Sequence, residues 1–197
     1  MSRRSQLKRR SVRQHHRASD GNRHVDSRER AILESLDRAV RSARQTIESI
    51  VTVVDAKLHH RSDDVLAWQS IPLHLYATQL PETIRSSWVF VLRANVITGA
   101  ERHPNSHQRM LSYRGRGDFQ TQAGGKWYSH QLRSEPDAPL NERWISIPVS
   151  VWHQGVVGPD DWAVVSFHTV SEDELIEERP AIAAGERARQ RKYAQES

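Results

Sequence analysis

Apolar residues recur at alternating spacings of three and four between positions 26 and 60. The series consists of Leu33, Leu36, Val40, Ala43, Ile47, Ile50 and Val54. These spacings place all of its members on one stripe of an α-helix. Asp26, with Glu29 three residues later, is typical of a capping box at a helix start. The pattern predicts one long amphipathic helix, which we interpret as packed on the outside of the domain. A dimerising coiled coil, and with it a homodimer, is the alternative.

From Ile71 onward the chain changes to short β-prone runs that are broken by proline, glycine and polar turns. The predicted strands are 72–80, 87–94, 109–113, 126–133, 143–151 and 162–170, with a further pairing around 96–100. Such a set suffices for a two-sheet sandwich or small β-barrel. We expect a hairpin connection at 118–126, a longer loop at 134–141 and the start of a closing helix at 171–175.

These patterns divide the chain into a disordered basic tail (1–25), a helical segment (26–62), a β-barrel domain (63–180) and a charged C-terminal tail (181–197). The basic character belongs to the first part. Residues 1–30 hold ten Lys and Arg against three acids, whereas the remainder holds nineteen basic and twenty-one acidic residues. A tail of this kind can contact nucleic-acid phosphates, but it carries no aromatic residue for stacking on bases. Nucleic acid is therefore expected as a partner only through this tail.

Composition excludes several classes of protein. The longest clear apolar run, 88–92, is too short to span a bilayer, and the N-terminus lacks the apolar stretch of a secretory signal. A cytoplasmic protein without a membrane partner is the expected class. The chain contains no cysteine, so any metal must be bound by nitrogen and oxygen ligands.

The residues with the clearest chemical signal lie between positions 99 and 115. Glu101 and His103 are two apart, so on a strand both side chains emerge on the same face. His107 lies four residues further on, and a helical zinc pair would use that spacing. Pro104 directly after the first histidine, together with the surrounding β-prone sequence, argues against a helix there.

Two segments give this region a family resemblance. Glu101 and His103, followed by Gln108 and Gly115, match the spacing of the first cupin motif, in which His and Glu residues bind metal. Residues 148–153, ending in His153, match the second cupin motif, with Ser150 at its glycine. The chain thus resembles the cupin superfamily over about residues 72–170. The resemblance implies an all-β cupin fold, a small β-barrel or two-sheet sandwich, here with an N-terminal amphipathic helix. It also implies a metal bound by Glu101, His103 and His153, with His107 or Gln108 as the fourth ligand or as a pocket residue.

One branch, the thiol dioxygenases related to cysteine dioxygenase, is closer in detail. Residues 101–107 resemble its His-x-His-x-x-Ser-His motif, with Glu101 at the first histidine. Ser166 and His168 resemble its Ser-x-His-x-Tyr relay, with Val170 at the tyrosine. The resemblance implies that His168, oriented by Ser166, moves protons, and that an arginine before the barrel, for which Arg85 is the nearest candidate, holds a substrate anion.

Two neutral imidazoles and one carboxylate leave a divalent ion with open coordination positions, as in non-haem Fe(II) oxygenases. The sequence therefore favours an Fe(II) dioxygenase that acts on a small polar or thiol-containing molecule. Mn, Ni or Zn would bind the same ligands. One alternative is a metal-dependent isomerase or lyase on the same barrel. The other is a non-enzymatic effector-binding cupin whose basic arm touches nucleic acid. The fold alone does not choose among the three.

Overall fold

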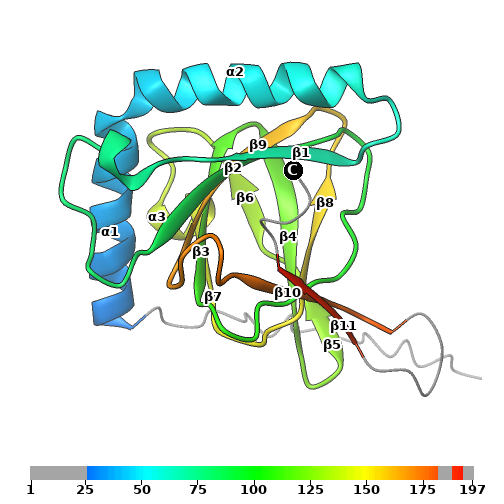
Figure 1. Cartoon of the computed structure of the whole chain (residues 1–197). Coiled ribbons are helices and arrows are strands. Elements are labelled where there is room, and N and C mark those ends of the chain that lie inside the picture. The colour runs from blue at the N-terminus through cyan, green and yellow to red at the C-terminus, as the bar shows by residue number, and fades with distance from the viewer. Residues whose placement is uncertain (1–25, 182–187, 193–197) are drawn as a thin grey trace, which may run out of the picture.

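The computed structural model describes residues 26–181 and 188–192 and consists of two antiparallel sheets with helices outside one of them (Figure 1). In spatial order, the first sheet contains β1 (Leu66–Ser70), β2 (Ser86–Leu92), β9 (Trp162–His168), β3 (Gln108–Arg114) and β7 (Trp144–Ile147). The second is built around β4 (Arg116–Ala123), which pairs with β5 (Lys126–Tyr128), β6 (Gln131–Arg133) and β8 (His153–Val157). This arrangement confirms the expected all-β class, two antiparallel sheets behind an N-terminal helical segment.

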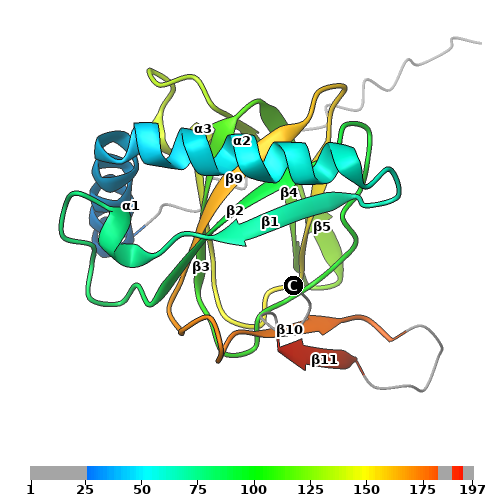
Figure 2. The same cartoon turned by 45° about the horizontal axis from the view of Figure 1, so that its top comes forward.

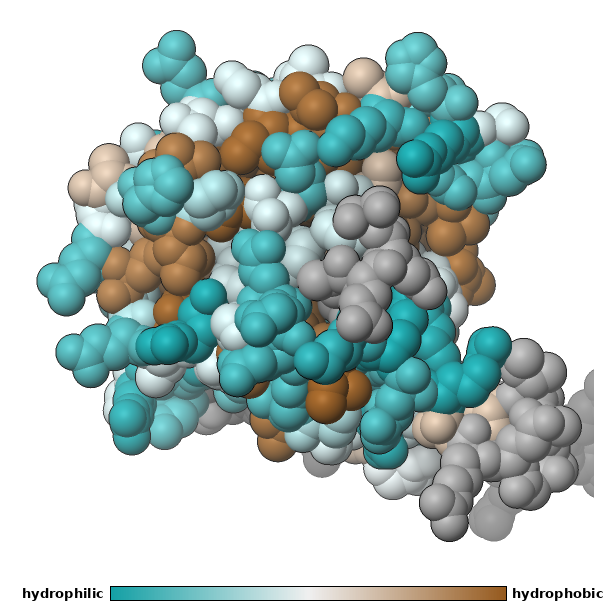
Figure 3. Space-filling model, in the orientation of Figure 1, coloured by the Kyte–Doolittle hydropathy of each residue, from teal (hydrophilic) through white to brown (hydrophobic). Residues whose placement is uncertain are grey.

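Two further strands, β10 (Ile176–Arg179) and β11 (Arg189–Lys192), pair with each other outside both sheets. We refer to this pair as the β10–β11 ribbon. An isolated bridge between Arg102 and Glu178 joins it to the segment that contains the candidate ligands. Hydrophilic side chains gather over the ribbon in the lower part of the face shown in Figure 3. The C-terminal segment, expected only as a charged tail, thus contributes a strand, while residues 182–187, 193–197 and the basic tail 1–25 lie outside the described part.

Side chains along the strands alternate between two cores. On β9, for example, Trp162 and Val164 face the barrel interior, whereas Val165 and Phe167 face the helices. The interior core between the sheets consists of Leu92, Met110, Phe119, Leu132, Ile145, Ile147, Val157, Trp162 and Val164. Polar side chains that fall on the inward positions are therefore brought into one enclosed space.

The predicted single helix is two helices, α1 (Ser27–Ser42) and α2 (Arg44–His60), which run in clearly different directions (Figures 1 and 2). They meet at Ala43, and α2 crosses the outer face of the first sheet. The residues of the predicted apolar stripe are buried as expected, except for Ile50, which is only half-buried. Its neighbour Val51, outside the predicted stripe, is fully buried instead. Because the stripe packs against the chain's own sheet, it offers no seam for a coiled coil.

The start of α1 fits only half of the predicted capping box. The Asp26 carboxylate accepts a hydrogen bond from the Arg28 N–H at 3.2 Å, as an N-cap should. Glu29 instead reaches across to the sheet, where it binds Arg109 (Oε1 to Nε, 2.7 Å) and Ser146 (2.6 Å). This contact fixes the beginning of the helix on β3 and β7.

Several predicted strands are confirmed, and others need correction. The expectations for 87–94, 109–113 and 162–170 correspond to β2, β3 and β9, whereas 126–133 divides into β5 and β6. The run 143–151 shortens to β7, after α3 (Leu140–Arg143), and 72–80 holds only the short helix η1 (Leu73–Leu75). Residues 171–175 form a single turn rather than a helix, because β10 begins directly after it.

The predicted hairpin connection at 118–126 is shorter than expected: the turn between β4 and β5 consists of Gly124 and Gly125, and residues 118–123 belong to β4. The buried positions of β4 alternate, with Gly117, Phe119 and Thr121 on one face. A Cβ on Gly117 would lie 2.2 Å from the Trp162 ring, so this glycine makes room for an indole. Within the described part of the chain, no helix combines the length and the apolarity needed to cross a membrane.

Candidate metal centre

Glu101 and His153 face each other across one antiparallel bridge. The Glu101 N–H donates to the His153 carbonyl at 2.9 Å, and the His153 N–H donates to the Glu101 carbonyl at 2.8 Å. His103 follows two residues after Glu101, so its side chain emerges on the same side. One ligand atom from each of the three residues lies within 4.8 Å of the other two. The structure thus brings together the three residues that the sequence proposed as ligands.

Both histidines present the same ring nitrogen to the centre of this group. His103 Nδ1 lies 3.1 Å from the Ile176 carbonyl, and His153 Nδ1 lies 3.0 Å from the Val151 carbonyl. Since a carbonyl only accepts, each Nδ1 carries the hydrogen, and each Nε2 keeps a lone pair. Fixing the tautomer through an outer hydrogen bond is the usual arrangement of metal-binding histidines.

His153 Nε2 is the most informative atom of the group. His153 is 1% exposed, and its Nε2 has no hydrogen-bond partner among the described residues. Glu101 Oε1 lies 3.5 Å away, and with the hydrogen on Nδ1 these two atoms present lone pairs to each other. A buried nitrogen lone pair without a partner is costly, and a divalent cation between these atoms would satisfy it.

The charge states suit cation binding. Burial, together with the neighbouring His153, lowers the pKa of His103 to about 4, so its imidazole is neutral at pH 7. Burial alone would raise the pKa of the Glu101 carboxyl, but His153, His103 and Arg179 outweigh it and hold the pKa below its ordinary value. The group therefore offers two nitrogen donors and one carboxylate.

Arg179, on β10, is a member of the site that sequence reasoning missed. Its Nη2 donates to Glu101 Oε2 at 2.8 Å, its Nη1 to the Thr98 carbonyl at 3.2 Å and its Nε to Glu177 Oε1 at 2.7 Å. One Glu101 oxygen is thus held by a guanidinium, while the other faces His153. Arg179 orients the carboxylate so that a single oxygen is presented to the centre of the group.

His168 lies in the barrel interior beside His103, with the two rings edge to face and their centroids 5.0 Å apart. Its Nε2 is 2.8 Å from Ser166 Oγ, so the expected contact between these residues is present. Its Nδ1 is 3.2 Å from Ser106 Oγ. Burial, followed by the charges of His103 and His153, lowers the pKa of His168 well below its usual range. Both nitrogens are engaged by hydroxyl groups, which fits a ring that supports His103 better than an open proton acceptor.

The other three predicted site residues differ in their placement. Gln108 points inward, lines the same cavity as Glu101 and has a buried amide oxygen without a partner among the described residues. His107 lies on the helix side, where its Nε2 is 2.7 Å from Ser146 Oγ and 3.8 Å from Glu29 Oε1. Arg85 is exposed before β2 and lines neither of the two cavities described below.

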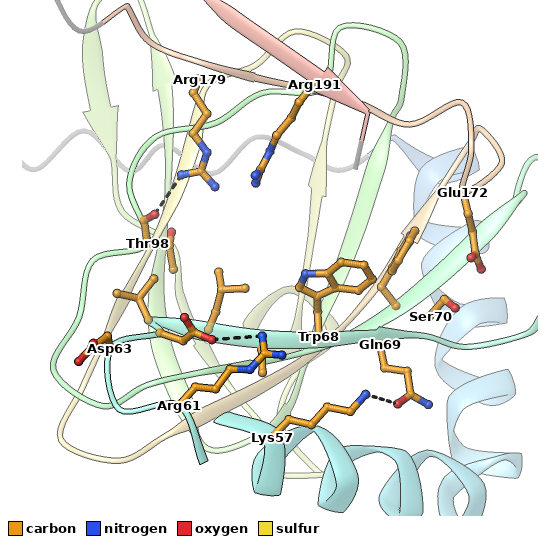
Figure 4. Close-up of a pocket in the computed structure, with 15 residues that line it drawn as sticks. Lys57, Arg61, Asp63, Trp68, Gln69, Ser70, Thr98, Glu172, Arg179 and Arg191 are labelled. Carbon is orange, nitrogen blue, oxygen red and sulfur yellow. Dashed lines mark hydrogen bonds and ion pairs between the residues drawn. The ribbon is translucent and has the colours of Figure 1, made fainter. Parts of the chain in front are cut away.

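Two hollows adjoin the metal group. A small interior cavity of about 40 Å³ is lined by Glu101 and Gln108 among mainly apolar side chains. A groove of about 890 Å³ runs along β1 and is bounded on the other side by the β10–β11 ribbon (Figure 4). Leu66 and Thr98 line both. The groove therefore lies next to the interior cavity.

A second group of possible ligands, Asp55, His59 and Asp161, lies where the end of α2 meets the turn before β9. Two of its four carboxylate oxygens are paired outside the group: Asp55 Oδ2 accepts from Arg114 at 3.0 Å, and Asp161 Oδ1 accepts from the Ala94 N–H at 2.7 Å. The His59 side chain is 60% exposed. This group links α2 to the turn before β9 and is open to solvent, so water can satisfy its polar atoms, whereas the group around Glu101 is buried.

The donor set of Glu101, His103 and His153 fits a divalent ion such as Fe(II), Mn(II) or Zn(II), all of which accept imidazole and carboxylate ligands. No protein-family model and no curated protein matches the chain. Among solved structures, it is similar to pumpkin seed globulin (18% identity, TM-score 0.46, covering 59% of this chain and 28% of the other). It is likewise similar to an oxalate oxidase in complex with the substrate analogue glycolate (15% identity, TM-score 0.43, covering 56% of this chain and 53% of the other). A third similar structure is the capsular polysaccharide assembling protein CapF from Staphylococcus aureus (15% identity, TM-score 0.44, covering 57% of this chain and 28% of the other). The chain thus spans between about a quarter and about half of the length of these proteins, and identity this low transfers no activity to it.

Proposed function

We propose that this protein is a metal-dependent enzyme of the cupin type in which Glu101, His103 and His153 bind one Fe(II) ion and a small molecule is oxidised by O₂. The observation that supports it most is the buried His153 Nε2, which has no partner among the described residues and lies 3.5 Å from Glu101 Oε1. A structural histidine at this depth would be hydrogen-bonded through both nitrogens.

Each residue around the group has a defined task in this proposal. When bound, Fe(II) supplies open coordination positions at which O₂ and substrate can meet. The Ile176 and Val151 carbonyls hold the two imidazoles in the ligating tautomer. Arg179 keeps Glu101 oriented, and Gln108 presents an amide to the interior cavity. His168, between Ser106 and Ser166, supports the His103 ring from the side.

The test begins with elemental analysis of the purified full-length chain, for which we expect about one divalent ion per chain. A His60→Ala variant is the matched control, because His60 is exposed at the end of α2 and lies outside the candidate group. His103→Gln and His153→Ala should lose most of the metal while keeping the wild-type circular dichroism spectrum. Full metal occupancy in both folded variants would contradict the assignment of these residues.

Oxygen uptake with candidate thiols and small organic acids then tests the reaction class. Fe(II)-dependent uptake that the His153→Ala change abolishes would support the oxygenase. The same donor set binds Mn(II), Ni(II) or Zn(II), so turnover without O₂ and with one of these ions would instead indicate an isomerase or lyase. Binding of a small molecule with no turnover under either condition would favour an effector-binding protein.

A further inference from the structure

The interior cavity beside Glu101 is small and mostly apolar. Ten residues line it, and six of them carry large apolar side chains: Leu66, Phe90, Leu92, Met110, Phe119 and Val164. Its volume is about 40 Å³. Since one water molecule needs roughly 10–15 Å³ of such space, the cavity holds about three water-sized groups. A molecule that binds wholly inside it therefore has about three non-hydrogen atoms.

Two of the polar side chains that line the cavity have no hydrogen to give to a ligand. The Thr98 hydroxyl donates to the Gly99 carbonyl at 3.3 Å and accepts from the Gly155 N–H at 2.9 Å. The Glu101 carboxylate has only acceptor atoms, and its Oε2 accepts from Arg179 at 2.8 Å. A ligand in the cavity therefore has to supply a donor itself.

Gln108 contributes an acceptor that the protein leaves unpaired. Its strand, β3, is paired on both edges at this position, with Ile147 of β7 and His168 of β9, so its backbone is fixed. The side chain is buried, and its amide oxygen has no hydrogen-bond partner among the described residues. A buried acceptor without a donor is costly. A ligand that carries an O–H group would satisfy it.

Ligands with acceptors only suit this cavity less well. Formate or a nitrile has no hydrogen to offer, so either would add a further acceptor beside Gln108 Oε1 and the Glu101 carboxylate. A hydroxyl group donates its hydrogen and keeps two lone pairs, one of which can bind a metal ion. Because most of the walls are apolar, the rest of the molecule should be apolar as well. These features favour a short alcohol over an acid of the same size.

Gly155, on β8, keeps part of this space open. A Cβ at this position would lie 3.4 Å from Leu92 Cδ1 and 3.4 Å from Thr98 Cγ2. Both of these residues line the cavity with Gly155. The contacts would be ordinary van der Waals contacts, so an alanine fits and its methyl group occupies space that the glycine leaves empty. The missing side chain therefore helps to set the size of the ligand.

We propose that the interior cavity binds a neutral alcohol of about three non-hydrogen atoms, whose hydroxyl group donates to Gln108 Oε1 and whose carbon atoms lie against the apolar walls. Gln108 selects the hydroxyl group, and Gly155 sets the size limit. That this ligand is the substrate rests on the proposed function, but its binding to the cavity does not require turnover. A molecule of this size binds with a Kd of about 1 mM at best, so the measurement must detect weak binding.

Binding is measured by NMR on the full-length chain labelled with ¹³C at the methionine methyl groups. The chain has two methionines. Met110 lines the cavity, Met1 supplies the reference signal, and a Met110→Leu variant assigns the two. Ethanol, methanol, acetonitrile, formate and 1-butanol are titrated with EDTA and again after loading with Zn(II). From the Met110 signal we expect ethanol to bind at least tenfold more tightly than acetonitrile, which has as many non-hydrogen atoms but no donor. The longer 1-butanol should also bind more weakly than ethanol.

Gln108→Leu removes the acceptor and should weaken ethanol binding about tenfold while leaving acetonitrile unchanged. The variant should not unfold at a lower urea concentration than the wild type, because it removes an unpaired buried polar group. Gln45→Leu, at an exposed position of α2, is the matched control.

Gly155→Ala should weaken the binding of ethanol more than that of methanol, because the added methyl group takes up part of the cavity. Gly158→Ala is the matched control, since a Cβ there would have no atom within 4 Å. An unchanged ratio of the two affinities in Gly155→Ala would overturn the size limit assigned to this glycine.

Three results would overturn the ligand class: equal affinity for ethanol and acetonitrile, tighter binding of formate than of ethanol with EDTA, or a folded Gln108→Leu variant that binds ethanol like the wild type. Gln108-dependent binding of ethanol by a chain that takes up no metal would uphold the ligand class and refute the proposed function. Metal uptake without selective binding of ethanol would do the reverse.

Discussion

Two buried polar groups of this protein differ in how completely their atoms are paired. In the group under α1, Asp37 Oδ1 accepts from Arg143 Nη1 and from Trp144 Nε1 at 3.0 Å. Asp37 Oδ2 accepts from Arg143 Nη2 at 3.0 Å and from Arg41 Nε at 2.8 Å. Every carboxylate lone pair that points into the protein therefore has a donor. Such a group joins helix to sheet and has no capacity left for a ligand.

The group around Glu101 is paired everywhere except at its centre. The outer nitrogens of His103 and His153 and the outer oxygen of Glu101 all have partners. The inner nitrogen of His153 has none among the described residues. Both groups are buried and charged, so burial and charge alone do not distinguish a candidate binding site from a structural ion pair. An unpaired nitrogen lone pair that faces a carboxylate and a second imidazole indicates a candidate cation site, because a divalent ion would satisfy all three.

The largest effect should come from removing an inner ligand. His153→Ala deletes one of three donors, so metal affinity should fall by more than the roughly 10–100-fold that loss of an outer hydrogen-bond partner typically costs. Competition with a fluorescent chelator measures it. We expect the urea midpoint of the metal-free chain to change much less than the affinity does, and a collapse of that midpoint would indicate a structural histidine instead.

The satisfied group should behave in the opposite way. Arg143→Met leaves the Asp37 carboxylate buried without its bidentate partner, and the expected loss in the free energy of unfolding is about 3 kcal/mol. Urea unfolding of the metal-free chain measures it. Metal affinity should remain that of the wild type. The double variant Asp37→Leu/Arg143→Met should recover much of the loss, because apolar side chains replace the ion pair. If the double variant has as low a free energy of unfolding as the single one, Asp37 and Arg143 stabilise the fold through their packing rather than through their charges.

The pH dependence of stability should follow Asp37. Burial opposes ionisation of Asp37, but Arg143, Trp144 and Arg41 outweigh it and lower the pKa of its carboxyl from 3.8 to about 2. Because the folded pKa lies below the unfolded one, the carboxylate contributes stability above pH 3.8 that is lost as the pH falls to about 2. The contribution is about 2 kcal/mol. Between pH 3.8 and about 2, the free energy of unfolding should change less with pH in Asp37→Asn than in the wild type. An equal pH dependence in both proteins would contradict the assignment.

The smallest expected effect concerns Arg179, which touches the metal group from outside. Arg179→Gln frees Glu101 Oε2 and should weaken metal binding by about tenfold through loss of carboxylate orientation. Lys192→Gln serves as the control for removing a positive charge from the ribbon. Chelator competition can resolve a change of this size. Unchanged affinity in Arg179→Gln would show that the bridge to His153 alone positions Glu101.

Sequence reasoning could bring the three candidate ligands together because two of them are spaced for one face of an extended segment and the third came from a motif resemblance. Glu101 and His103 are two residues apart, and the second motif placed His153 opposite them. The choice between His107 and Gln108 could not be made in the same way. The chain between His103 and β3 is irregular, so counting residues from Glu101 does not tell which positions of β3 face inward. Only the paired strand shows that Gln108 and Met110 point inside.

Arg179 could not be identified from the sequence because its strand lacks the usual signal. The segment 176–179 holds two acids and one arginine, and both acids, Glu177 and Glu178, are buried. Strand assignment from sequence relies on alternating apolar residues, and here ion pairs with Arg102, Arg179 and Arg191 take their place. A charged strand of this kind is stabilised by partners distant in the chain, which no local pattern reveals.

The double attachment of Ile176 determines how the ribbon moves. Its carbonyl accepts from His103 Nδ1 at 3.1 Å, and its N–H donates to Asn105 Oδ1 at 3.2 Å, while Asn105 Nδ2 donates to the Glu174 carbonyl at 2.7 Å. Lifting the ribbon would break these bonds together and dismantle the histidine that they orient. Amide hydrogens at Ile176 and Glu178 should therefore exchange as slowly as those of β9, on the timescale of cooperative unfolding. β10 thus acts as a fixed wall beside the candidate ligands, held by the same bonds that orient His103.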